Sequence, residues 1–178
     1  MKTVIIVAIF GLISLSSKAQ TYATNFTTDD CDGTSHTLFD ELDEGKVIVI
    51  GWTMPCFSCI GPLISAHDAV GSFDATNPGE VLFYLVDDYN DTDCGTVESW
   101  GLSNGFIKTD AFFASDDIKM SDYGLDGMPK VVVLACNSHK VFLNKNDFIS
   151  YDEVHDAIEM ALSSDGCFLE LDDPSLNL

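Results

Sequence analysis

Residues 46–63 read KVIVIGWTMPCFSCIGPL, and this stretch decides the fold. It opens with the nearly unbroken apolar run Lys46–Trp52, which is typical of a strand buried on both faces of a sheet. From Ile60 to Phe73 the apolar residues then recur at helical spacing. The stretch therefore predicts a core strand that leads through a tight turn into a helix, with Cys56 and Cys59 at the junction.

The position of this cysteine pair predicts thiol chemistry. The first turn of a helix has unpaired N–H groups and the positive end of the helix dipole, and both stabilise a thiolate. Because the thiolate is the nucleophile in disulfide exchange, Cys56 is the expected attacking residue. Cys59 lies one turn later on the same face, where it can resolve the mixed disulfide.

Other interpretations of the pair remain open at this point. In an oxidising compartment the two cysteines could form a permanent, inert disulfide of a secreted binding or structural domain. A zinc site would need two further ligands, for which His67 is the nearest candidate, and there is no second CxxC. Copper binding, with Met54 as an additional soft ligand, is also disfavoured. We expect no metal site.

The rest of the chain alternates strands with helices. Further strands are expected at 80–86, 111–114, 130–135 and 140–143, helices at 96–102 and 151–162, and a short helical turn at 38–42. An N-terminal β-hairpin joins 25–28 to 35–38 across a turn that contains Asp32-Gly33. This order predicts an α/β domain of three layers (α/β/α) around a mixed sheet.

The charge balance restricts the partners. The 178 residues include 8 Lys, no Arg and 29 acidic residues, which gives a formal net charge of −21. Nucleic-acid binding needs clustered cations, so we expect no nucleic-acid partner. Neutral or basic partners are favoured.

Both ends of the chain differ from the middle. Lys2 is followed by an apolar stretch that is too short for an ordinary membrane span, and Ser17-Lys18-Ala19 has the small residues of a cleavage site. We therefore interpret 1–19 as a signal peptide, with an uncleaved anchor as the alternative, 20–163 as the folded domain and 164–178 as an acidic tail. The residue directly after the cut is Gln20 and not the cysteine of a lipoprotein, so we expect no lipid anchor. We expect the protein in a periplasm or outside the cell, without stable membrane insertion.

A second motif, Gly127-Met128-Pro129, precedes the strand at 130–135. Together with Trp52-x3-Cys56-x2-Cys59, it resembles the thioredoxin superfamily. Residues 25–49 are similar to the opening of TlpA-like, AhpC/TSA-related exported thioredoxins, and the resemblance covers about residues 23–163. It implies a thioredoxin fold with Pro129 as a cis-proline that faces the cysteine pair.

The resemblance also implies the activity, which is thiol–disulfide exchange on protein thiols and disulfides, with another protein as the redox partner. Cys56 and Cys59 become the redox pair, and Trp52, Met128 and Pro129 shape the substrate-binding surface. No dissociable cofactor is implied. Family members often carry a buried acid six residues before the first cysteine, whereas this chain has Ile50. A peroxiredoxin is not expected, because that motif needs Pro where Val49 stands, together with an arginine.

Four cysteines lie outside the pair. In the implied fold we expect a Cys136–Cys167 disulfide, which leaves Cys31 and Cys94 to pair with each other; the alternative makes Cys94 an additional redox thiol. We expect the remaining polar residues to have no part in catalysis. We expect His67 on a helix surface and Asp87-Asp88 in a solvated loop, although these two acids could instead border the active-site cleft.

Overall fold

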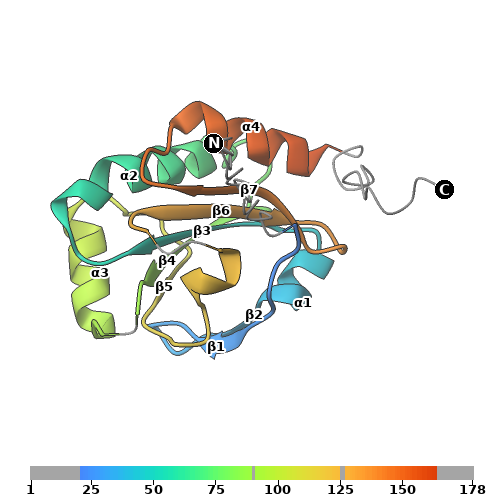
Figure 1. The fold of residues 1–178 in the computed structure, drawn as a ribbon. Coiled ribbons are helices and arrows are strands. Elements are labelled where there is room, and N and C mark those ends of the chain that lie inside the picture. The colour runs from blue at the N-terminus through green and yellow to red at the C-terminus, as the bar shows by residue number, and fades with distance from the viewer. Residues whose placement is uncertain (1–20, 90, 125–126, 164–178) are drawn as a thin grey trace, which may run out of the picture.

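The computed structural model describes residues 21–89, 91–124 and 127–163 (Figure 1). The predicted signal peptide and acidic tail lie outside these residues and stay predictions. Within them, no helix combines the length and the apolar character that crossing a bilayer requires. The elements, in chain order, are β1 (Thr27–Asp29), β2 (Ser35–Thr37), α1 (Leu38–Asp43), β3 (Val47–Thr53), α2 (Phe57–Gly71), β4 (Val81–Asp87), α3 (Cys94–Ser103), β5 (Ala111–Phe113), the 3₁₀ helix η1 (Met120–Tyr123), β6 (Lys130–Ala135), β7 (Lys140–Asn146) and α4 (Tyr151–Leu162).

The main sheet has the strand order β5-β4-β3-β6-β7. Strand β3 runs parallel to β4, and β4 runs parallel to β5, whereas β6 is antiparallel to both of its neighbours. The central strand is β3, and all seven of its residues are buried. The apolar run at 46–52 therefore has the position that its pattern predicts, and the mixed sheet is confirmed.

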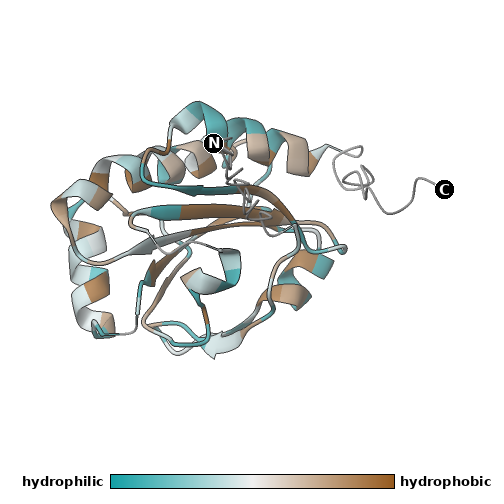
Figure 2. Ribbon diagram, in the orientation of Figure 1, coloured by the Kyte–Doolittle hydropathy of each residue, from teal (hydrophilic) through white to brown (hydrophobic). Residues whose placement is uncertain are grey.

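Helices α2 and α4 cover one face of the sheet, while α1, the β1–β2 hairpin and η1 lie against the other (Figure 1). Hydrophobic residues are concentrated along the strands and on the inward sides of the helices (Figure 2). Alternate residues of β3 enter the two clusters, since Val47 and Val49 belong to the cluster under α2 and α4, whereas Ile48 and Ile50 belong to the other. The expected three-layer α/β architecture is confirmed.

Helix α2 packs very closely on β3. A Cβ at Gly51 would lie only 2.9 Å from Leu63 Cδ2 and 3.1 Å from Phe83 Cζ, so a larger residue here would force these two side chains to shift. Pro62 lies inside α2, and the helix continues through it from Phe57 to Gly71. Proline has no N–H, so α2 lacks the backbone hydrogen bond that residue 62 would otherwise donate.

His67 is buried in the core, and the expectation of a surface position was wrong. It lies four residues after Leu63 and three before Val70, so it shares their core-facing side of α2. Its ring meets the edges of Phe83 and Phe106 at centroid distances of 5.4 and 5.5 Å. Its Nδ1 is 3.8 Å from Asp68 Oδ1, beyond hydrogen-bonding distance.

Burial makes His67 a source of acid sensitivity. Desolvation lowers the pKa of His67 below 6.5, despite the opposing charges of Asp68, Asp110 and Asp74. Between the folded pKa and 6.5 the unfolded state binds more protons, so the free energy of unfolding must fall as the pH drops below 6.5, by at most about 1.4 kcal/mol per pH unit. We expect His67→Leu to remove this slope in urea titrations at pH 7.5 and 5.5, and His155→Asn, on the partly exposed side of α4, to retain it. Equal slopes in all three proteins would contradict the assignment.

Candidate active site

The cysteine pair lies where β3 passes into α2. Cys56 is the N-cap of α2 and Cys59 lies in its first turn, and the two form a disulfide with an S–S distance of 2.04 Å. Cys59 is completely buried, whereas Cys56 is partly exposed, and the Cys56 Sγ also lies 3.5 Å from Ser58 Oγ. An external sulfur can therefore approach Cys56 and cannot approach Cys59.

The surroundings of Cys56 suit a thiolate and an apolar partner. Cys56 precedes a 15-residue helix whose first turn contains no acidic residue, so the positive end of the helix dipole is uncompensated there. Phe57 is 92% exposed and Met54 is 50% exposed, so apolar side chains flank the disulfide on both sides in the sequence. Exposed apolar residues of this size at a reactive group are typical of a protein-binding surface.

The second predicted motif lies at the same edge of the sheet. The Met128–Pro129 peptide bond is cis, as the resemblance implies. Strands β3 and β6 pair with Trp52 opposite Lys130, which places Pro129 next to the end of β3, where the chain turns toward Cys56. Pro129 is buried and Met128 is partly exposed.

A buried lysine holds this loop, and the sequence analysis did not find it. Lys130 is 1% exposed, and its Nζ donates to the carbonyl of Tyr123 at 3.0 Å and to Asn146 Oδ1 at 3.1 Å. Asn146 Nδ2 in turn donates to the carbonyl of Gly127 at 2.7 Å. The lysine and the asparagine thus fix the chain on both sides of Met128. The signal in the sequence that could have indicated this role is a lysine at the start of the otherwise apolar strand β6.

Trp52 lies in the core behind the site. Its side chain is completely buried, and its indole N–H donates to the carbonyl of Ile118 at 3.1 Å. It also packs against Tyr123, with the ring centroids 5.5 Å apart. A side chain with no exposed surface does not touch a docked protein, so the structure places Trp52 behind the surface that the sequence analysis assigned to it.

Asp87 and Asp88 border this edge and are not solvated, so the loop interpretation was wrong. Asp87 ends β4 beside Thr53, and the amide of Asp88 donates to the carbonyl of Thr53 at 3.0 Å. Asp87 is 1% exposed and Asp88 is 8% exposed. The Oδ2 of Asp87 accepts bonds from the amides of Asp91 and Thr92. The Oδ1 atoms of both acids are buried and have no hydrogen-bond partner within the described ranges of the chain. The pairing of adjacent parallel strands determines their burial, and the residues 87–88 alone do not show it.

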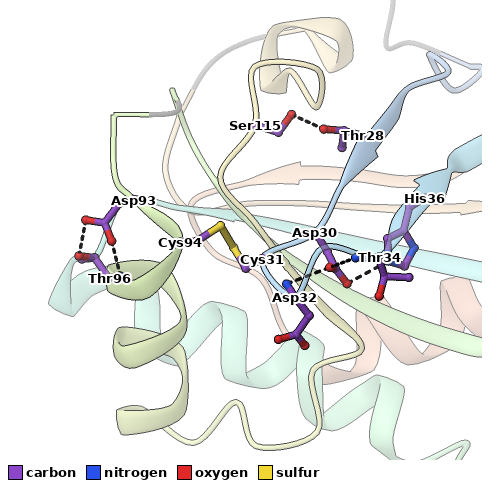
Figure 3. The surroundings of a disulfide bond; sticks show 10 residues. All are labelled: Thr28, Asp30, Cys31, Asp32, Thr34, His36, Asp93, Cys94, Thr96 and Ser115. Atoms are coloured by element: carbon purple, nitrogen blue, oxygen red, sulfur yellow. Dashed lines mark hydrogen bonds and ion pairs between the residues drawn. A yellow bond between two sulfur atoms is a disulfide. The ribbon is translucent and has the colours of Figure 1, made fainter.

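A second disulfide joins Cys31 to Cys94, as expected, and excludes a free thiol at Cys94 (Figure 3). It connects the turn of the β1–β2 hairpin to the first residue of α3. The amide of Cys31 donates to the carbonyl of Phe112 at 2.8 Å, and Asp93 caps α3 by accepting from the amide of Thr96 at 3.1 Å. The hairpin, β5 and α3 are therefore fixed together at one point.

The expected Cys136–Cys167 bond stays a prediction, because Cys167 lies outside the described residues. Cys136 is buried and follows directly after β6.

Potential cation ligands in the described part of the chain are carboxylates and one histidine. Three acids, Asp87, Asp88 and Asp91, bring oxygens within 4.8 Å of one another, as do the ligand atoms of His155, Asp156 and Glu159. Neither group contains a cysteine, and Cys56 and Cys59 are bonded to each other.

Comparison with solved structures identifies the fold. A thioredoxin-family thiol:disulfide interchange protein from Chlorobium tepidum matches with a TM-score of 0.62 and 15% identity, over 83% of this chain and 99% of that one. The thioredoxin domain of a thiol-disulfide oxidoreductase from Bacteroides vulgatus matches with a TM-score of 0.61 and 16% identity, over 83% of this chain and all of that one. A secreted disulfide oxidoreductase from Mycobacterium tuberculosis, described as homologous to E. coli DsbE, gives 0.56 and 19% identity, over 75% and 94%.

No protein-family model matches the sequence, and no curated protein matches it. At identities of 15–19% the structural matches establish the fold. The chain has a thioredoxin fold, as the sequence resemblance implies.

Proposed function

We propose that this protein is a thiol–disulfide oxidoreductase that acts on protein thiols and disulfides. It has a thioredoxin fold, and its cysteine pair, with one accessible sulfur, follows the central strand. The observation that carries the proposal is the asymmetry of the Cys56–Cys59 disulfide, in which a partly exposed sulfur at a helix N-terminus covers a completely buried one. The solved structures of similar fold carry the same kind of activity in their names, which supports the proposal.

The proposed reaction uses two consecutive exchanges. In the reduced protein the Cys56 thiolate attacks one sulfur of a substrate disulfide, forms a Cys56–substrate bond and releases the other substrate sulfur as a thiolate. Cys59 then loses its proton and attacks Cys56 Sγ, so the second substrate thiolate leaves and the Cys56–Cys59 bond forms. Two electrons pass to the substrate, and a partner dithiol must restore the reduced pair. The reverse sequence oxidises a substrate dithiol.

The surface around Cys56 accounts for a protein substrate. Phe57 and Met54 supply exposed apolar contacts, and Met128 is accessible beside them at the sheet edge. We assign Met128 and Pro129 to substrate binding, whereas Trp52 and Lys130 position the segments that carry the site. The redox partner is an unidentified protein, and neither a dissociable cofactor nor a metal ion enters the reaction.

We place the protein in a periplasm or outside the cell, after cleavage of residues 1–19. The Cys31–Cys94 disulfide supports this placement, since structural disulfides persist in oxidising compartments. One of the proteins of similar fold is described as secreted.

Reduction of insulin by dithiothreitol tests the activity. We expect the wild-type protein at micromolar concentration to shorten the lag before the insulin B chain precipitates, because Cys56 exchanges with the insulin disulfides faster than the small dithiol does. A lag equal to that without protein, in a sample whose Cys56–Cys59 bond is shown to open in the same buffer, would leave an inert disulfide and reject the enzyme.

A further inference from the structure

A cavity of about 420 Å³ lies between the segment after β4 and the segment that runs from β5 into η1. Its lining includes Asp88, Tyr89, Asp116, Ile118, Lys119 and Met120. Two backbone contacts connect it to the end of β3, because the amide of Asp88 binds the carbonyl of Thr53 and the carbonyl of Ile118 accepts the indole N–H of Trp52. The cavity thus opens next to the turn that leads to Cys56.

The acidic side of the cavity lacks a counter-charge. Asp88 is 92% buried, and its Oδ1 has no hydrogen-bond partner among the residues that the structure describes. Burial, followed by the charges of Asp87 and Asp91, raises the pKa of Asp88. The backbone N–H groups of Asp88 and Tyr89 oppose this rise in pKa only in part. The described ion pairs include none that involves Asp88 or Asp116. A buried carboxylate with no cationic partner among the described residues is costly, so this wall favours a cation.

The remaining walls suit the stem of a long basic side chain. Ile118 and Met120 are buried and apolar, and Tyr89 is 60% exposed at the rim, where its ring can stack on a guanidinium or ammonium group. Lys119 also lines the cavity and supplies one opposing charge to Asp88 and Asp116. The local balance therefore remains acidic, in a protein whose formal charge is −21.

We propose that this cavity binds a lysine or arginine side chain of the polypeptide substrate, with Asp88 as the principal acceptor and Asp116 at the rim. The inference rests on the proposed function and specifies its substrate class, which is a cysteine-containing segment with a basic residue nearby. Charge complementarity selects this occupant, because an acidic segment would bring a second carboxylate against Asp88.

The chain geometry limits the spacing in the substrate. Thr53 and Cys56 are three Cα-to-Cα steps apart, which an extended chain spans in at most about 11 Å, and the hydrogen bond from Asp88 adds 3.0 Å. A bound peptide in extended form covers that distance in about four residues. The basic residue therefore lies within about four positions of the reactive cysteine.

Peptides that differ at one position test the proposal. Each carries a single cysteine as a mixed disulfide with thionitrobenzoate, and the third residue from it is lysine, norleucine or glutamate. The Cys56 thiolate of the reduced protein attacks the peptide sulfur, and the yellow thionitrobenzoate anion leaves with the bonding electrons. We expect the second-order rate constant of the lysine peptide to exceed that of the norleucine peptide about tenfold, which corresponds to about 1.4 kcal/mol, and the glutamate peptide to be slowest.

Variants separate a specific contact from the general field of an acidic protein. In Asp88→Asn the lysine-to-norleucine ratio should fall to about two, whereas Asp156→Asn, which removes the same charge from exposed surface on α4, should keep it near ten. The ratio should persist at 0.5 M NaCl, where long-range attraction is screened. Asp116→Asn, at the exposed rim, should reduce the ratio in the same direction and serves if Asp88→Asn does not fold.

Each remaining outcome has a definite meaning. Equal rates for the three peptides reject the cavity contact while leaving the oxidoreductase intact, whereas no reaction with any peptide rejects the proposed function itself. Loss of the lysine preference in wild-type protein on addition of 5 mM CaCl₂ or MgCl₂, at constant ionic strength, would show that the carboxylates hold a divalent ion, and would overturn the assignment.

Discussion

Replacing Cys56 with serine is expected to lower the catalysed rate of insulin reduction by at least ~10³-fold, to the rate of dithiothreitol alone, as removal of a nucleophile does in other enzymes. A serine hydroxyl is no nucleophile toward disulfide sulfur at neutral pH, and the buried Cys59 cannot replace it because no substrate sulfur can reach it. The measurement is the insulin precipitation rate at equal protein concentrations.

Cys59→Ser is the matched control, since both variants lose the same disulfide and leave one thiol. It should still attack substrate disulfides, and because no second thiol resolves the product, a covalent substrate complex should accumulate on non-reducing gels and disappear with reductant. Accumulation of that complex in Cys56→Ser instead would reverse the roles of the two cysteines. Insulin reduction at the wild-type rate by both variants would remove the cysteine pair from the mechanism.

Removing the Cys31–Cys94 disulfide should produce the largest loss of stability. The bond closes a loop with a sequence separation of 63, for which the chain-entropy relation gives about 4 kcal/mol. Both cysteines are partly exposed, so alanine at both positions should create little cavity and isolate this contribution. We expect Cys31→Ala/Cys94→Ala to lower the free energy of unfolding in urea by about that amount, without reductant.

The single-site variant Ser99→Ala, on the exposed side of α3, provides a control for changes in that helix and should unfold like the wild type. A loss below about 1 kcal/mol in the double variant would mean that the hydrogen bonds within the hairpin turn and at the N-terminus of α3, drawn in Figure 3, already hold each segment in place without the disulfide. The disulfide would then be redundant for folding.

The sequence predicted the elements well where one periodicity dominates. The apolar runs at 46–52, 80–86 and 130–135 became the three central strands, because strands buried on both faces lack polar residues. The position of the cysteine pair could also be predicted, because the junction between strand and helix is formed by residues that are neighbours in the sequence.

Predictions failed where burial depends on residues distant in the chain. The spacing of His67 to Leu63 and Val70 places it on the core-facing side of α2. A pattern that counts only apolar residues does not detect this position, because histidine is polar. The burial of Asp87 and Asp88 arises from neighbouring strands and loops that cover the end of β4. Trp52 has the position in the chain that the resemblance implies, and η1 and its flanking loop cover it.

The close packing at Gly51 restricts substitution in one part of the site, whereas another part of the site tolerates it. Any larger residue there would displace the Leu63 and Phe83 side chains, which belong to the same core cluster as the buried Cys59. Phe57 and Ser58, between the two sulfurs, are exposed and outside both hydrophobic clusters. Evolution, or a protein engineer, is therefore free to adjust the electron affinity of the pair through these two residues at little risk to folding.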